Sequence, residues 1–127
     1  MSIERFSSGG PWEKAVGYSR AVRAGNLVFV AGCTGVGEDG EVVPGGAYEQ
    51  AAQACRNVAA ALELAGAGVA DVVQTRMYVT DIAQWEAVGR AHAEVFGAAP
   101  PVSAMVQVSG FISPAMVVEI EATAFVV

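Results

Sequence analysis

Two glutamates near the C-terminus are the residues whose type and spacing point most directly to chemistry. Glu119 and Glu121 are two positions apart in the segment MVVEIEATAFVV, where apolar and polar residues alternate. This alternation predicts a β-strand with both carboxylates on one face and an apolar set on the other. The apolar set is Val118, Ile120, Ala122 and Ala124. The carboxylate face is therefore either solvated or part of a polar cleft.

The other reactive side chains are few. Cys33, Cys55 and the single histidine, His92, are far apart in the sequence, and they do not supply a metal-ligand set. A catalytic Cys33 thiolate would need a nearby base or cation. His92 falls on a predicted amphipathic helix, so packing in or beside the core is favoured over a Cys33–His92 pair. The glycine-rich loop 32–46 lacks the lysine and Ser/Thr pattern of a phosphate cradle.

Length and charge narrow the class of protein. Residues 1–127 fit one domain. Thirteen acidic against seven basic residues give a net charge of −6, which argues against a nucleic-acid surface. No apolar run approaches the roughly 20 residues of a membrane span, and the N-terminus does not read as a secretion signal. We therefore expect a cytoplasmic protein with reduced thiols, no metal and no membrane partner.

The elements that would position these residues follow from periodicity and breakers. We predict strands over 18–23 and 27–31, a helix over 48–65, a strand over 72–79, a helix from Asp81 to Gly97, and two strands between Pro100 and Val127. Residues 1–17 read as a lead-in rich in serine, glycine and proline. The apolar stripe predicted for the second helix is Trp85, Val88, His92, Val95 and Phe96.

This order predicts an α+β fold with a single sheet and both helices on one of its faces. The other face would carry Phe29, Tyr78 and Phe125, and the sequence provides no further helix to cover it. With 54% hydrophobic and only 16% charged residues, the chain is unusually apolar for its size. We therefore expect copies of the chain to associate through the uncovered sheet face.

Three segments in this order resemble the YjgF/RidA family, the reactive-intermediate deaminases. They are GYSRAVRAGNLVFVAGCTG, then GRAHAEVFG ahead of Pro100 and Pro101, and VEIEATA near the C-terminus. The resemblance covers about Tyr18 to Val127. It implies a RidA-like domain with a chorismate-mutase-like fold, assembled as a homotrimer. It also implies small-molecule clefts between subunits and no cofactor.

The resemblance assigns roles to several residues. Glu119 matches a carboxylate that orients water or substrate; an ion pair at a subunit contact is the alternative, and for Glu121 a structural role is favoured. Tyr18 matches a tyrosine that reaches into the adjoining subunit's cleft, although it could instead anchor a sheet edge. Gly32 matches a glycine whose surroundings offer backbone amides to the ligand. Cys33 follows it directly and could line the cleft.

One position departs from the family pattern. Ser103 stands where the family's PARS motif supplies an arginine that pairs with the substrate carboxylate. A hydroxyl cannot give the bidentate grip of a guanidinium, so hydrolysis of 2-imino or enamine acids cannot be carried over intact. By strand parity Arg76 points with Gln74 and Tyr78, and we expect that face to be the one carrying Glu119. Arg76 could replace the arginine, but an ion pair with the glutamates is favoured.

Three functions stay open. The first is an enzyme that binds a small carbonyl, imine or enamine metabolite and attacks it with water oriented by Glu119. The second is a non-catalytic member that binds a metabolite or a protein partner; the serine at position 103 favours it. The third is the family's historical endoribonuclease assignment, which the acidic charge makes weakest. Trp12, Arg20 and Arg23 could close over the cleft mouth.

Overall fold

The computed structural model describes residues 2–127. Its strands and helices alternate along most of the chain. In order they are β1 (Ile3–Phe6), α1 (Pro11–Val16), β2 (Ala21–Ala24), β3 (Leu27–Thr34), α2 (Ala47–Leu64), β4 (Val72–Val79), α3 (Trp85–Phe96), β5 (Val102–Gln107) and β6 (Val118–Phe125). Two 3₁₀ turns, η1 (Val69–Asp71) and η2 (Ile82–Gln84), precede β4 and α3.

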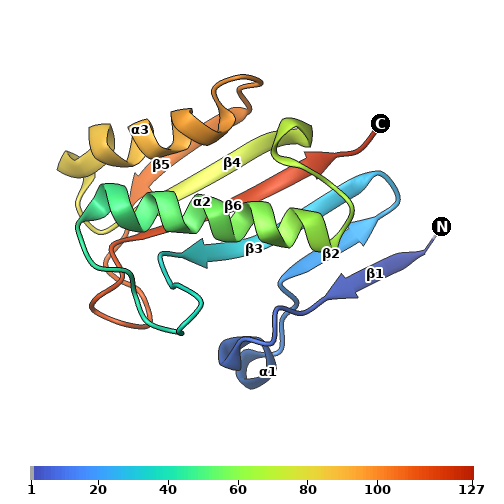
Figure 1. Cartoon of the computed structure of the whole chain (residues 1–127), viewed down its shortest axis with the longest axis horizontal. Coiled ribbons are helices and arrows are strands. Elements are labelled where there is room, and N and C mark those ends of the chain that lie inside the picture. The colour runs from blue at the N-terminus through green and yellow to red at the C-terminus, as the bar shows by residue number, and fades with distance from the viewer. Residues whose placement is uncertain (1) are drawn as a thin grey trace.

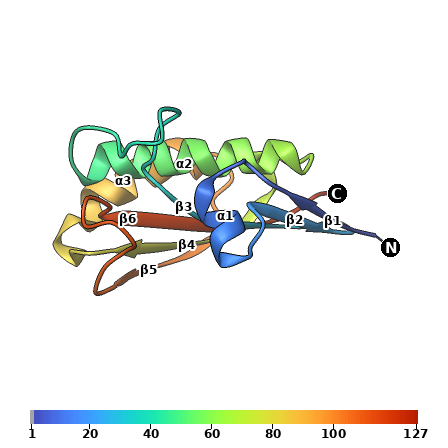
Figure 2. The same ribbon diagram turned by 90° about the horizontal axis from the view of Figure 1, so that it is seen from below.

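The strands form one mixed sheet in the order β1-β2-β3-β6-β4-β5. All neighbours are antiparallel except β4 and β5, which are parallel and are joined by a crossover through α3. The C-terminal strand β6 therefore lies in the middle of the sheet, between β3 and β4 (Figure 1). Helices α2 and α3 cover one face of the sheet (Figure 2). The predicted α+β fold with both helices on one face is confirmed.

The N-terminal segment differs from the prediction. Residues 1–17 were expected to be an irregular lead-in, but they contain β1 and α1. Strand β1 is a short edge strand whose four residues alternate too little to be recognised. Helix α1 has Pro11 at its start and ends at Gly17, which has a φ of 89°. Because the whole segment is rich in serine, glycine and proline, these two helix-boundary residues did not stand out, and the short helix was missed.

The core lies between the sheet and the two long helices. Small side chains of α2 allow its close approach to the sheet, and a Cβ on Gly35 would come within 2.8 Å of the Gln50 Cα atom. On α3, Val88 and Phe96 are buried as predicted. Trp85 is 57% exposed, so its assignment to the apolar stripe was wrong. It occupies the first position of α3, directly after η2.

The opposite face of the sheet is not covered by any helix of residues 2–127 (Figure 2). We call it the open face. Its side chains come from β3 to β6 and include Phe29, Gln74, Arg76, Tyr78, Val102, Val106, Glu119, Glu121, Thr123 and Phe125. Phe29 and Phe125 are each 45% exposed, as expected for a sheet face that lacks its second layer. Across residues 2–127, no helix combines the length and the apolar character of a membrane span.

Candidate functional site

A β-bulge places Glu119 against Gly32. The pairing of β3 with β6 shifts register between Val30 and Cys33, after which Thr34 pairs with Glu119. The Glu119 carboxylate occupies the space where a side chain at position 32 would begin, and a Cβ there would overlap it. Glycine is therefore required at this position for room beside the carboxylate.

The electrostatic setting of Glu119 favours its protonated form. Burial is the largest influence and raises the pKa of this carboxyl, and the negative charge of Glu121 raises it further. The positive charge of Arg20 acts in the opposite direction, but the net result is a raised pKa. A half-buried carboxyl with a raised pKa is a candidate for accepting and returning a proton during catalysis.

Arg20 holds the residues around the bulge together. Its Nη1 donates to the carbonyl oxygens of Gly32 at 2.9 Å and Ala31 at 3.3 Å, and contacts the Cys33 Sγ at 3.3 Å. Its Nη2 donates to the Tyr18 hydroxyl oxygen at 3.2 Å. Because Tyr18 accepts this bond, its own phenolic hydrogen is free to donate to another group. Three of the predicted site residues thus meet around one guanidinium.

Glu13 completes this group, and sequence reasoning missed it. Its side chain is buried and its Oε2 lies 3.6 Å from the Arg20 Nε atom. Burial alone would raise the pKa of Glu13, but hydrogen bonds from Ser8 and Ser7 together with the Arg20 charge lower it. An ionised carboxylate is therefore held beside the guanidinium. The signal was weak because Glu13 belongs to the N-terminal segment that was read as irregular.

Cys33 is a poor nucleophile in this setting. Its side chain is buried on the helix-covered side, opposite Ile120 of β6. Burial raises the pKa of the thiol more than the neighbouring Arg20 lowers it. The alternative partner His92 is engaged elsewhere, with its Nε2 at 2.8 Å from the Thr75 Oγ1. A Cys33–His92 pair is therefore not formed.

Ser103 belongs to a separate, neutral group. Strand β5 aligns it with Thr75, whose Oγ1 donates to the Ser103 Oγ at 2.8 Å. Thr75 is 1% exposed and also bonds His92, so this group lies on the helix-covered side of the sheet. Glu119 lies on the open face. A single chain therefore does not bring Ser103 and Glu119 together, and a site that uses both requires a second copy.

Arg76 lies on the face expected from strand parity. It is aligned with Glu121, and its Nη1 is 3.7 Å from the Glu121 Oε1. The Tyr78 hydroxyl also donates to Glu121. Glu121 is thus held by two residues of β4. Glu119 is aligned with Tyr78 in the sheet, but neither of these two contacts involves it. This agrees with the expected ion pair between Arg76 and a glutamate.

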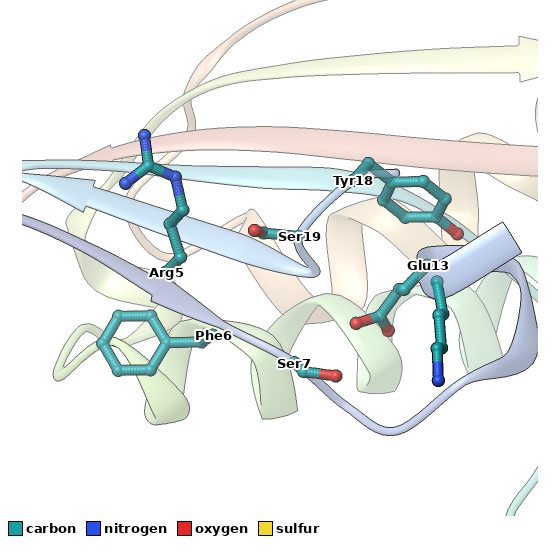
Figure 3. Close-up of a pocket in the computed structure, with 7 residues that line it drawn as sticks. Arg5, Phe6, Ser7, Glu13, Tyr18 and Ser19 are labelled. Carbon is teal, nitrogen blue, oxygen red and sulfur yellow. The ribbon is translucent and has the colours of Figure 1, made fainter. Parts of the chain in front are cut away.

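Two hollows flank these groups. One of about 260 Å³ is lined by residues from β1, α1 and the segment before β2, with Tyr18 and Glu13 at one end and Arg5 and Phe6 at the other (Figure 3). The second, of about 320 Å³, lies between the start of α2 and the end of β4. Neither is lined by Glu119 or Ser103. Within residues 2–127, no group of three or more His, Cys, Asp or Glu side chains could hold a metal.

The chain is thus a small α+β protein whose helices cover only one face of the sheet. At a β-bulge, the Glu119 carboxylate packs directly against Gly32. The family profile described as Endoribonuclease L-PSP matches residues 11–126. A Mycobacterium tuberculosis structure, from the highly conserved YjgF/YER057c/UK114 family, is 50% identical; the match covers 98% of this chain and 100% of that one, with a TM-score of 0.90. This chain belongs to the YjgF/UK114 family, which confirms the resemblance.

Curated relatives extend the comparison. An uncharacterised protein of Streptomyces coelicolor is 37% identical over 124 residues, which are 98% of this chain and 92% of the relative. A Capra hircus protein named 2-iminobutanoate/2-iminopropanoate deaminase is 32% identical over 124 residues, covering 96% of this chain and 90% of the relative. Imine deaminase is therefore among the activities named within the family.

Proposed function

We propose that this protein hydrolyses a small imine or enamine in clefts formed between three copies of the chain. The observation that carries the proposal is the Glu119 carboxylate, half-buried, with a raised pKa, and set against Gly32. A carboxyl in this state can take a proton from water and later return it. The deaminase name of the goat relative, at 32% identity, is consistent with this chemistry.

Trimer formation is part of the same proposal. The open face carries exposed apolar side chains, including Phe29, Phe125, Val102 and Val106, which a second layer would bury. A site that uses Ser103 together with Glu119 takes one residue from each of two copies, because a single chain holds them on opposite sides of its sheet. Three is the number of copies that the family resemblance implies.

The proposed reaction consumes a protonated imine and one water molecule. Glu119 takes a proton from water as the water oxygen bonds to the imine carbon, and the C=N π electrons move to nitrogen. Glu119 then returns the proton to the nitrogen of the carbinolamine. The C–N bond breaks and its electron pair leaves with ammonia. The hydroxyl becomes the carbonyl of the product, and its proton passes to ammonia to give ammonium.

The other predicted residues bind and orient in this scheme. The Tyr18 phenol, whose oxygen accepts from Arg20, directs its hydrogen toward the ligand. Backbone amides at Gly32 and Cys33 and the Ser103 hydroxyl of the neighbouring copy hold the developing oxygen. Cys33 contributes its backbone only, because its thiol is buried and protonated.

The competing function is a family member that binds a metabolite or protein partner without catalysis. It is favoured by one observation: Ser103, at the family's arginine position, bonds to Thr75. A serine held in this way supplies less electrostatic stabilisation than a guanidinium.

Imine hydrolysis separates the two functions. An amine or amino-acid oxidase generates the imine in situ, semicarbazide traps what remains, and the trapped fraction is followed with and without this protein. We expect faster loss of imine with the wild type, and roughly 10²-fold or greater loss of that rate for Glu119→Gln.

Glu121→Gln is the matched control because it removes a carboxylate from the same strand and face. We expect this variant to stay within several-fold of the wild type. No acceleration of hydrolysis by the wild type with any small imine would overturn the catalytic proposal and support the binding function.

A further inference from the structure

Near the bulge, two carboxyl groups share the neighbourhood of a single guanidinium. Glu13 and Glu119 are two carboxylates in the neighbourhood of one guanidinium, that of Arg20. Glu13 is buried, ionised and 3.6 Å from the Arg20 Nε, so it is the direct ion-pair partner of Arg20. Glu119 is left as the carboxylate without a direct cationic partner.

Arg20 is also poorly placed to receive a second carboxylate from a ligand. Its side chain is 14% exposed, and Nη1 is shared among Ala31, Gly32 and Cys33. Nη2 donates one hydrogen to Tyr18. Within residues 2–127 this leaves one N–H of Nη2 and the Nε N–H, which faces the ionised Glu13 at 3.6 Å, without a hydrogen-bond acceptor. A bidentate grip on a carboxylate needs two parallel N–H groups, so a ligand carboxylate at Arg20 would have to displace Glu13.

The remaining cations near the site are engaged or lie elsewhere. Arg76 is directed at Glu121, 3.7 Å away. Arg5 and Lys14 line the hollow beside Tyr18, which does not include Glu119. Position 103 offers a neutral hydroxyl bonded to Thr75. An anionic ligand at Glu119 would therefore be an additional negative charge beside a carboxyl that already resists ionisation.

We infer that the cleft selects imines that carry no carboxylate, whose protonated form is a cation, over the 2-imino acids named for the goat relative. The inference rests on the proposed function and specifies its substrate class. A small iminium cation beside Glu119 would favour the ionised form of this carboxyl, whereas an anion would oppose it. The Tyr18 and Ser103 hydroxyls can bond the nitrogen of the ligand and the incoming oxygen. An imino acid would bring a carboxylate that could bind Arg20 only by displacing Glu13.

Two imines that differ only by a carboxylate test this selectivity. Propan-1-imine is generated from propylamine by an amine oxidase, and 2-iminobutanoate from 2-aminobutanoate by an amino-acid oxidase. We expect kcat/KM for propan-1-imine to exceed that for 2-iminobutanoate by at least tenfold. A preference for 2-iminobutanoate would overturn the inference while leaving the proposed hydrolysis intact.

Variants at two positions sharpen the test. Ser103→Arg supplies the missing guanidinium, so we expect it to lower the selectivity ratio at least tenfold, whereas Ser103→Asn, which stays neutral, leaves the ratio near the wild-type value. Arg76→Gln is also expected to leave the ratio unchanged. If Arg76→Gln instead abolishes activity toward 2-iminobutanoate alone, Arg76 is the carboxylate receptor and the inference is wrong.

Binding distinguishes failure of the inference from failure of the proposed function. If neither imine is hydrolysed, calorimetric titration with propylammonium and with 2-oxobutanoate still measures the charge preference. We expect propylammonium to bind at least tenfold more tightly, and Glu119→Gln to remove the difference. Tighter binding of 2-oxobutanoate, or no binding of either probe, would overturn the inference.

Discussion

The two faces of strand β6 differ in burial and in chemical character. Val118, Ile120, Ala122 and Ala124 face the helices and are at most 4% exposed. The alternate residues, from Glu119 to Phe125, are partly or largely exposed on the open face. One face is completed within a single chain, and the other combines carboxylates with apolar side chains that no helix covers. The helix-covered face therefore contributes most of the stability. In our proposal, the open face provides the subunit contacts and the catalytic carboxylate.

A second contrast follows the same division. The group around Arg20 is charged and joins the bulge, Tyr18 and Glu13. The group around Thr75 is neutral and joins Ser103 to His92 beneath α3. Burial also lowers the pKa of His92, which keeps this group uncharged at neutral pH. Among residues 2–127, the charged group and the neutral group share no hydrogen bond or ion pair.

The largest difference between the two faces should be seen in stability. Ile120→Ala leaves a cavity beneath the helices, and we expect it to lower the free energy of unfolding by about 2–5 kcal/mol. Thr123→Ala, on the open face of the same strand, should change it by less than about 1 kcal/mol. Urea unfolding at one fixed protein concentration measures both. Equal losses would contradict the division between the faces.

Assembly should respond to charge on the open face only. Phe125→Asp places a carboxylate on that face, and we expect particles near the single-chain mass of 13.0 kDa, with imine hydrolysis lost and the far-ultraviolet circular dichroism retained. Leu64→Asp, at the end of α2, adds the same charge at a residue of similar exposure, 47% against 45%. This control should keep the wild-type mass. Dissociation of both variants would remove the special role of the open face.

Close packing at the bulge gives a smaller but specific effect. Gly32→Ala inserts a Cβ into the space of the Glu119 carboxylate, so the carboxylate must move. We expect kcat to fall by roughly 10²-fold, the size of effect that a displacement of about 1 Å can have. Gly110→Ala, where a Cβ would meet nothing within 4 Å, serves as the control in the same assay. A fully active Gly32→Ala would show that the position of Glu119 is not critical.

The pH dependence of stability should show the smallest effect. The folded protein raises the pKa of Glu119 above its ordinary 4.5, so the folded state binds more protons than the unfolded state. The contribution of this group to stability is therefore lost as pH rises from about 4.5 through the folded-state pKa. We expect the melting temperature of Glu119→Gln, relative to the wild type, to increase over that range. A difference that is constant with pH would contradict the raised pKa.

Which residues lie on each face of the sheet was largely predictable, because it depends on the alternation of residues along each strand. The alternation in β6 predicted which of its residues face the helices, and strand parity placed Arg76 on the face of Glu121. The helix predicted over 48–65 is α2, Ala47–Leu64. Strand and helix periods are local properties of the sequence, so they can be read without knowledge of the tertiary contacts.

The rest depended on contacts between distant residues. The bulge that sets Glu119 against Gly32 results from the register between β3 and β6, which are more than 80 residues apart. Glu13 is recognised only once α1 places it beside Arg20. The position of Ser103 opposite Thr75 follows from the parallel pairing of β4 and β5. No local pattern encodes these juxtapositions, so charge partners were the hardest part of the site to predict.

Sedimentation velocity of the unmodified protein at micromolar concentration tests most directly whether other copies cover the open face and complete the cleft. We expect one main species with a mass close to three times 13.0 kDa. A single compact species of 13.0 kDa across that concentration range would contradict the proposal, because Glu119 and Ser103 would then never meet.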